Sequence, residues 1–311
     1  MLTVTQYNAS NDLQHDDFLN VGVLSATGSA QKTASEPISE PALERPRQKM
    51  LWYIPGLGGS VQTALGFLQP FLESGFDTIY GTDLRGFGLN AHCSPGQVIQ
   101  QQAQDLSLFY RRVILPQTRT DQVSVTLCGI SLGGLLATHL LTLNPEWFEA
   151  CILLAPAYAP NPVKFTAFYR LKAILTLLLN TALLNGKNAQ VTLPYTIEDI
   201  TQNPDILNNP EFSNLPALAV NPRFLLSIDA FSKRLQAKLS TVSKPVYMLV
   251  PLQDKVCDPD TMQVVFQQMP QSKQNACVLE PCEHDITYEP KARQYATDAL
   301  HWLSKLGAVA P

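Results

Sequence analysis

The sequence has few charges and few cysteines. Charged residues make up 15% of the 311 residues, and 22 basic residues against 26 acidic ones leave a formal net charge of −4. Because nucleic-acid-binding proteins normally carry a concentrated basic surface, no nucleic-acid partner is expected. The six cysteines form no CxxC pair and show no metal-ligand spacing. We therefore expect neither a disulfide scaffold nor a metal site.

Signals for export or membrane insertion are also missing. Residues 1–11 lack a basic segment followed by an apolar core, so they do not read as a signal peptide. The longest uncharged apolar stretch, 173–186, has 14 residues. A membrane-spanning helix needs about 20. These features predict a soluble, cytoplasmic protein with reduced thiols, one that can still touch a membrane from outside.

What is present is an alternation of short apolar runs with segments of helical length, in residues 49–156 and 244–311. The apolar runs are 51–54, 78–80, 123–127, 151–154, 246–250 and 277–279. The helical patterns are 98–113, 132–143, 259–268 and 291–306. Strands that alternate with helices form parallel sheets buried on both faces. The predicted class is therefore α/β, with a mostly parallel central sheet covered by helices on both faces.

Two regions depart from this alternation. Residues 1–48 are rich in Ser, Ala, Gln, Glu and Pro and show no period, which predicts a flexible extension, although 18–24 could add a short edge strand. Residues 157–243 carry helical patterns at 163–184 and 222–239 but no convincing strand. We expect them to form an all-helical cap, inserted between two strands above the edge of the sheet.

The strongest local signal is Gly-Ile-Ser-Leu-Gly-Gly at residues 129–134. It follows a predicted strand and opens a predicted helix. A serine on such a tight turn projects its hydroxyl above the sheet, and glycines two residues before and after it allow the backbones to approach closely. Ser131 is therefore the predicted nucleophile. The amide of Leu132, at the helix N-terminus, can help to stabilise an oxyanion.

A serine hydroxyl needs a base to become a good nucleophile. Five histidines compete for this role. His15 lies in the extension, His92 follows an earlier turn, and His139 and His301 lie within predicted helices. His284 alone follows the last predicted strand, in a loop. Enzymes with a nucleophilic serine on such a strand-to-helix turn place their histidine after the last strand, so His284 is the predicted base.

The carboxylate that orients the base should lie between the serine and the histidine in chain order. Asp254 follows the run 246–250 and lies in the loop at the end of a strand. Asp258 and Asp260 are its rivals. Asp258 precedes Pro259, which is typical of a helix N-cap followed by proline at the first helical position. Asp254 is therefore the predicted acid.

Two further turns follow early strands. The turn Pro-Gly-Leu-Gly-Gly at 55–59 offers backbone amides for a second oxyanion donor, and Leu57 is the expected one. The turn at 83–88 is expected to be structural, with Arg85 paired to a carboxylate. These turns complete a candidate site built from loops at one edge of the sheet.

Taken together, these motifs resemble the α/β-hydrolase superfamily, and within it the monoacylglycerol lipase and lysophospholipase (serine aminopeptidase S33-like) branch. The resemblance covers residues 50–306 and leaves the first 48 unmatched. The motifs that carry it are 54–60, 83–88, 129–134, Asp254, His284–Asp285, and the cap segments 201–205 and 221–225. Three positions depart from the branch, which usually has His where Pro55, Phe87 and Ile130 stand. These changes make the site less polar.

The resemblance implies an α/β-hydrolase fold and hydrolysis of a carboxylic ester through an acyl-enzyme, with no metal or cofactor. Ser131 would attack the carbonyl, His284 would carry the proton, and Asp254 would hold the imidazole. A thioesterase or an acyltransferase on the same triad is the alternative, and a non-catalytic binding protein is a further one. A dehydrogenase is not indicated, because no GxGxxG follows the first strand of the core.

The expected substrate is a monoacyl lipid ester, either a monoacylglycerol or a lysophospholipid. Apolar residues from Phe165 to Leu179 recur at helical spacing in the cap. Two interpretations stay open: the stripe packs on the sheet domain, or it forms an acyl-chain tunnel or a face for transient membrane contact. The predicted substrate-binding residues are Gly56, Gly58, Ile130, Phe165 and Phe168. No feature of the sequence predicts an oligomeric state.

Overall fold

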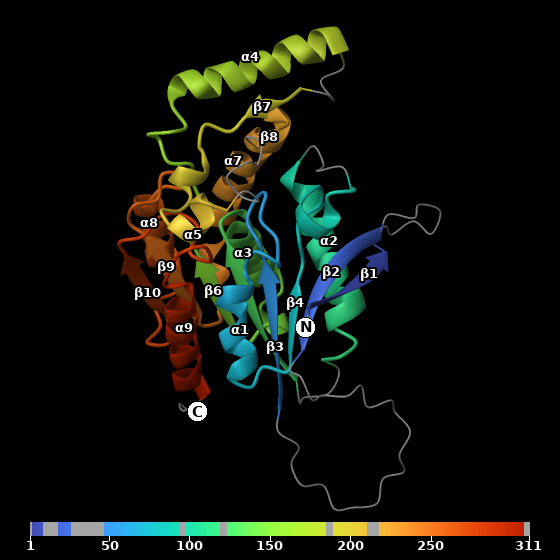
Figure 1. The fold of residues 1–311 in the computed structure, drawn as a ribbon, viewed down its shortest axis with the longest axis vertical. Helices are drawn as coiled ribbons and strands as arrows, with labels where there is room; N and C mark the ends of the chain where they lie inside the picture. Colours follow the sequence, from blue (N-terminus) through green and yellow to red (C-terminus); the bar gives the residue numbers. More distant parts are fainter. Residues whose placement is uncertain are drawn as a thin grey trace, which may run out of the picture.

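A mostly parallel eight-stranded sheet forms the centre of the computed structural model, in the order β1-β2-β4-β3-β5-β6-β9-β10 (Figure 1). The structure describes residues 2–8, 18–25, 47–93, 98–118, 123–184, 189–209 and 218–307. The strands are β1 (Leu2–Asn8), β2 (Phe18–Ser25), β3 (Gln48–Ile54), β4 (Thr78–Gly81), β5 (Val123–Ile130), β6 (Ala150–Leu154), β9 (Val246–Pro251) and β10 (Ala276–Glu280). From β4 to β10 every neighbour is parallel. The six predicted runs are all strands, and the α/β class is confirmed.

The first two strands correct the prediction for residues 1–48. β2 pairs antiparallel with β4, and β1 pairs antiparallel with β2 at the edge of the sheet. Leu19, Val21 and Leu24 are buried. A flexible extension is therefore wrong for residues 2–8 and 18–25, and the strand expected at 18–24 is present but does not lie at the edge. Residues 9–17 and 26–46 lie outside the described part of the chain.

Helices cover both faces of the sheet, with α1 and α9 in front of it and α3 behind it in Figure 1. They are α1 (Leu65–Glu73), α2 (Ile99–Phe109), α3 (Leu132–Leu143), α8 (Pro259–Gln268) and α9 (Ala292–Gly307). α3 and α8 span the residues predicted for them. α2 continues as a π-helical turn, Tyr110–Ile114. α1 was not among the predicted helical segments, and it contains Pro70, a residue that usually ends a helix.

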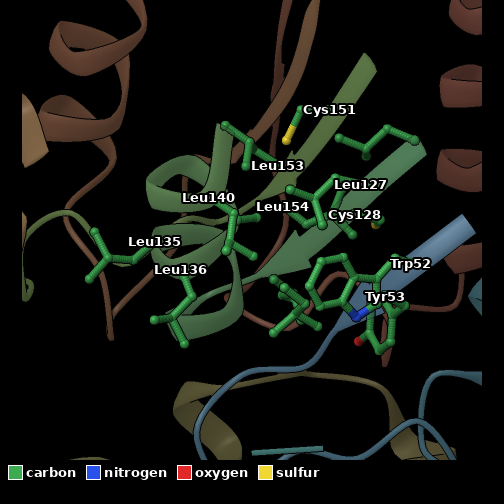
Figure 2. Close-up of a cluster of buried hydrophobic side chains, with 14 of the residues drawn as sticks. Trp52, Tyr53, Leu127, Cys128, Leu135, Leu136, Leu140, Cys151, Leu153 and Leu154 are labelled. Carbon is green, nitrogen blue, oxygen red and sulfur yellow. The ribbon is translucent and has the colours of Figure 1, made fainter. Parts of the chain in front are cut away.

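The hydrophobic core lies between β3, β5, β6 and α3 (Figure 2). Its labelled side chains are Trp52, Tyr53, Leu127, Cys128, Leu135, Leu136, Leu140, Cys151, Leu153 and Leu154. The indole of Trp52 is fully buried, and its N–H donates to the hydroxyl of Thr82 at 2.8 Å. A buried indole needs such a partner. The strands that end below the candidate site are thus fixed by tight packing.

The segment between β6 and β9 forms a separate layer above the carboxyl ends of the strands (Figure 1). It contains α4 (Ala167–Leu184), β7 (Val191–Thr192), a 3₁₀ turn (Ile197–Asp199), α5 (Pro204–Leu207), β8 (Ala219–Val220), α7 (Pro222–Gln236) and a second 3₁₀ turn (Leu239–Thr241). The expected all-helical cap is wrong in one respect, because β7 and β8 pair antiparallel. With two residues each, they are too short to form an apolar run. Among the described helices, none is long and apolar enough to cross a membrane.

Candidate active site

Ser131 occupies the sharp turn between β5 and α3. Its backbone has a φ of 53° and a ψ of −120°, a strained conformation that L-residues rarely adopt. The turn is held from both sides, because the Ser131 amide donates to the Leu154 carbonyl and its carbonyl accepts from the Ala157 amide, both at 2.9 Å. The backbone at the end of β6 and in the loop that follows it therefore stabilises the strained turn.

Two glycines let helix α3 approach the strands this closely. A Cβ atom at Gly133 would lie 2.1 Å from the carbonyl oxygen of Ile54, and one at Gly129 would lie 2.4 Å from the carbonyl oxygen of Gly133. Both contacts are with backbone atoms, which cannot move aside. The glycines that flank the serine are therefore required by packing between β3, β5 and α3.

The structure brings Ser131, His284 and Asp254 together from three separate loops. The Nε2 atom of His284 lies 2.9 Å from the Oγ atom of Ser131, and its Nδ1 atom lies 2.6 Å from Oδ2 of Asp254. The other carboxylate oxygen of Asp254 accepts from the amides of Val256 and Cys257, at 2.7 and 2.8 Å. This chain of hydrogen bonds can move a proton from the serine to the histidine.

The rival residues lie elsewhere. His139 lies in α3 and packs against an aromatic ring of α7, with a centroid separation of 4.5 Å, while His92 and His301 are exposed. Asp258 is the N-cap of α8, as its position before a proline indicated. His15 lies outside the described residues.

Burial and charge act on the buried groups of the site in different ways. For His284, desolvation favours a lower pKa, but the charge of Asp254 and the hydrogen bond to it outweigh that effect, so the pKa is raised above its ordinary value of 6.5. For the thiol of Cys257, burial raises the pKa well above its usual range, and the nearby Asp254 adds to the effect. The histidine is thus held as a stronger base, and the thiol stays protonated.

The two predicted oxyanion donors lie on either side of the serine. Leu132 is the first residue of α3, where the helix leaves its amide without an intrahelical acceptor. Leu57 lies in a turn closed by a hydrogen bond from the Gly59 amide to the Gly56 carbonyl at 3.1 Å. Leu57, Leu132 and Ser131 all line one pocket. A Cβ atom at Gly56 would lie 3.1 Å from the Cβ atom of Ser131, so the turn passes close to the nucleophile.

The turn at 83–88 is hydrogen-bonded to the segment that follows the turn at 55–59. The carboxylate of Asp83 accepts from the amides of Val61 and Leu89, at 2.7 and 2.8 Å. Burial raises the pKa of Asp83 to about 6, against the lowering effect of these two hydrogen bonds. Arg85 pairs with Asp105 at 2.8 Å, as expected of a structural residue. The turn therefore anchors the segment that follows the oxyanion loop.

A pocket of about 230 Å³ lies over Ser131, between the sheet and the cap. Most of its cap wall is apolar or aromatic. This wall includes Phe165, Tyr169, Ala173, Leu193, Tyr195 and Leu225. Of these residues, the sequence predicted a substrate-binding role for Phe165 alone. The others carry no local motif, because their inward direction depends on how the cap folds over the sheet.

Four of the five predicted substrate-binding residues lie outside the pocket wall. Phe168 is 78% exposed and does not line the pocket, because it lies on the outer side of α4. Ile130 is 2% exposed and belongs to the hydrophobic core below the site. Gly56 and Gly58 shape the oxyanion turn, and Gly58 has a φ of 83° that favours glycine. None of these four residues is part of the pocket wall.

Within the described residues, one group has the composition of a metal site. The ligand atoms of Asp254, Cys257 and His284 all lie within 4.8 Å of one another. Two of these side chains, Asp254 and His284, already share a hydrogen bond of 2.6 Å. A metal ion held by all three ligand atoms would have to replace that bond.

Comparison with known proteins agrees with this geometry. The family model described as "Serine aminopeptidase, S33" matches residues 45–291. The chain belongs to this family. The chain has the α/β-hydrolase fold, and its family is the branch that the sequence motifs resemble. A search of curated proteins by sequence found no match.

Solved structures share the fold of this S33-family hydrolase at low sequence identity. A monoacylglycerol lipase from Paleococcus ferrophilus is 18% identical, with a TM-score of 0.68, and the match covers 84% of this chain and 96% of that one. A soluble variant of monoglyceride lipase from Saccharomyces cerevisiae, solved with a substrate analogue, is 18% identical with a TM-score of 0.67, over 93% and 92% of the two chains. A thermostable carboxyl esterase from Bacillus coagulans, solved with glycerol, is 15% identical with a TM-score of 0.69, over 98% and 99%. Family and fold support the expected class, a carboxylic ester hydrolase.

Proposed function

We propose that the protein hydrolyses monoacyl lipid esters, either monoacylglycerols or lysophospholipids, with Ser131 as nucleophile. The observation that carries this proposal is the chain of two hydrogen bonds from Ser131 through His284 to Asp254, at 2.9 and 2.6 Å, below an apolar pocket. The lipases and the esterase of similar fold support the same reaction type.

The reaction follows from the positions of these groups. The Oγ atom of Ser131 attacks the ester carbonyl while Nε2 of His284 takes its proton, and the amides of Leu57 and Leu132 stabilise the oxyanion. The carbon–oxygen bond to the alcohol then breaks, and His284 returns the proton to the leaving alcohol. Water, activated by the same histidine, cleaves the acyl-enzyme to release the fatty acid and restore Ser131. Asp254 keeps the imidazole oriented throughout.

The cap favours a lipid over a small polar ester. The pocket wall is largely apolar, so it gains free energy by removing an acyl chain from water. The outer side of α4 also exposes apolar residues. These residues are Phe168, Leu171, Leu175, Leu178 and Leu179. The interpretation that this stripe packs on the sheet domain is therefore wrong for these five side chains.

A lipid surface is the partner that fits this outer side of α4. The helix carries Arg170 and Lys172, both exposed, and no acidic residue. Such a combination of apolar and basic side chains suits the interface of an anionic membrane. Ile174 both lines the pocket and is partly exposed, so the pocket and the exposed face are continuous. A transient contact would let a lipid pass from the membrane to Ser131.

A series of p-nitrophenyl esters from acetyl to palmitoyl tests the proposal. We expect kcat/KM to rise toward medium and long acyl chains in the wild type and to fall by about 10⁴-fold or more in Ser131→Ala. Ser304→Ala is the matched control, because Ser304 is exposed on α9, far along the chain from the site, and bonds only within its own helix. It should retain wild-type activity.

Two outcomes would count against the proposal. Activity confined to acetyl and butyryl esters would indicate a small-molecule esterase with a closed cap. Absence of Ser131-dependent turnover on every ester would overturn ester hydrolysis itself, and thioester substrates or an added alcohol acceptor would then identify a thioesterase or an acyltransferase.

A further inference from the structure

The pocket over Ser131 has few polar groups that are not already engaged. The hydroxyl of Tyr158 shares a hydrogen bond with that of Thr138 at 2.7 Å, and the hydroxyl of Tyr169 donates to the Thr192 carbonyl at 2.9 Å. These groups satisfy each other or the backbone. Besides the hydroxyl of Tyr195, which also lines the pocket, they leave little capacity for recognising a polar headgroup.

Two charged side chains line the same pocket, Arg170 from α4 and Asp229 from α7. Asp229 has a partner on its own helix, because its carboxylate accepts from the ammonium group of Lys233 at 2.8 Å. Among the described residues, none forms a hydrogen bond or an ion pair with the guanidinium group of Arg170. By contrast, the guanidinium group of Arg85 is buried and paired with Asp105. Arg170 is thus the cation in this wall that is available to a ligand.

The position of Arg170 places its charge at the mouth of the pocket. The residue is exposed and yet lines the pocket, so its side chain lies where the cavity meets solvent. Ala173 and Ile174 follow it by about one turn on the pocket side of α4. An amphiphile with its acyl chain against these apolar residues would therefore leave its headgroup within reach of the guanidinium group.

A guanidinium group recognises phosphate and carboxylate better than it recognises neutral hydroxyls. It presents parallel N–H donors that match two oxygens of an oxyanion, and charge-assisted hydrogen bonds are about twice as strong as neutral ones. A glycerol headgroup offers neither the charge nor the paired oxygens. A guanidinium group at the mouth of the pocket therefore favours esters with an anionic headgroup over neutral glycerol esters. The apolar pocket alone would accept both equally.

We propose that Arg170 is a specificity-determining residue that selects monoacyl esters with an anionic headgroup, phosphate or carboxylate, over neutral glycerol monoesters. This inference rests on the proposed function, because it concerns the same pocket and the same reaction. Its effect should lie in KM more than in kcat, since the headgroup contact is remote from the bonds that change. The contact should also weaken as ionic strength rises, because the arginine is exposed.

The test compares substrates with one acyl chain and different headgroups, all used as monomers below their aggregation concentration. Lauroyl glycerol is neutral, lauroyl glycerol 3-phosphate carries a phosphate, and the lauroyl ester of glycolic acid carries a carboxylate. For the wild type we expect kcat/KM to be about tenfold higher on the two anionic esters than on the neutral one. Arg170→Gln should remove this ratio through KM, and Arg170→Lys should restore part of it, more on phosphate than on carboxylate.

Arg234→Gln provides the matched control. Arg234 is exposed on α7 of the same cap and carries the same charge, but it does not line the pocket. It should keep the wild-type ratio. An equal loss in Arg170→Gln and Arg234→Gln would overturn the proposal in favour of a general field around the cap. A wild type that prefers the neutral ester, or an Arg170→Gln variant that loses all three substrates by one factor, would overturn it as well.

These results are separable from the fate of the proposed function. Hydrolysis of lauroyl glycerol that requires Ser131, with no preference for anionic esters, would reject the role of Arg170 alone. Absence of Ser131-dependent hydrolysis of any of the three esters would reject the proposed function, and with it the inference.

Discussion

The core and the cap of this hydrolase differ in how far their candidate functional side chains are buried and paired. In the core, Asp254 and His284 are buried, joined at 2.6 Å, and held by further backbone hydrogen bonds. In the cap, α4 exposes a row of apolar side chains and an arginine without a partner among the described residues. The side chains of the proposed triad are thus fixed by packing and hydrogen bonds, whereas the groups proposed to meet the lipid stay on the surface. Changes in the core should affect every substrate, and changes in the cap should affect the choice among substrates.

The largest effect should come from the core carboxylate. Asp254→Asn should lower kcat by about 10⁴-fold on every ester, because an amide no longer holds the histidine in the tautomer that accepts the serine proton. Stopped-flow or steady-state kinetics on a short and a long ester would measure this loss. Asp258→Asn is the control, since asparagine caps a helix as well as aspartate does. A loss below tenfold in Asp254→Asn would remove this residue from the proposed triad.

The next largest effect should be on stability. Gly133→Ala should destabilise the fold by at least about 4 kcal/mol, because its Cβ atom would lie 2.1 Å from the carbonyl oxygen of Ile54. Gly66→Ala is the control, because a Cβ atom there meets nothing within 4 Å inside helix α1. That change should be neutral or stabilising by up to about 1 kcal/mol. Urea unfolding of both variants would show whether the difference has the expected sign.

A smaller effect concerns pH. The proposed base must be neutral to accept a proton, and the neighbouring Asp254 raises the pKa of His284 above 6.5. The value of kcat/KM on a neutral ester should therefore fall about tenfold per pH unit on the acid side, with a midpoint above 6.5. The residual activity of Asp254→Asn should show a lower midpoint. A wild-type midpoint at or below 6.5 would show that burial outweighs the charge of Asp254.

The smallest effect on stability should come from the outer side of α4. Replacing both Leu171 and Leu178 by Ser should change the free energy of unfolding by no more than about 0.5 kcal/mol per site, because both are exposed. Leu140→Ala, in the buried part of α3, should cost about 2–5 kcal/mol. The α4 double variant should instead lose binding to anionic lipid vesicles in a sedimentation assay. Vesicle binding equal to that of the wild type would contradict the proposed membrane contact.

The two regions also differ in how far they could be predicted from the sequence. The core was predictable because its signals are local and ordered along the chain: a glycine-flanked Ser131 after a strand, then Asp254 and His284 after the last two strands of the sheet. Local motifs and chain order together indicate these residues, since the ends of parallel strands meet at one edge.

The cap was harder for a physical reason. Apolar spacing identified α4, but spacing does not tell which side of a helix meets the pocket. Phe165 was therefore correct as a pocket residue and Phe168 was not. Arg170 and Tyr195 had no signal, because their positions depend on long-range packing between the cap and the sheet. Likewise, the composition of residues 1–48 gave no signal for β1, and the strand expected at 18–24 was placed at the edge of the sheet, where β1 lies instead.

That pairing has a consequence for the limits of the folding unit. The family match spans residues 45–291, but a chain cut at those limits would lose β1, β2 and the whole of α9. Strand β4 would then expose a row of unpaired amides and carbonyls, which is a template for aggregation between molecules. The loss of α9 would also uncover α1, which packs against α9, and Tyr247 of β9, whose ring packs against Trp302. The chain therefore folds as a longer unit than its family match, and β1 takes the place of β4 as the edge strand of the sheet.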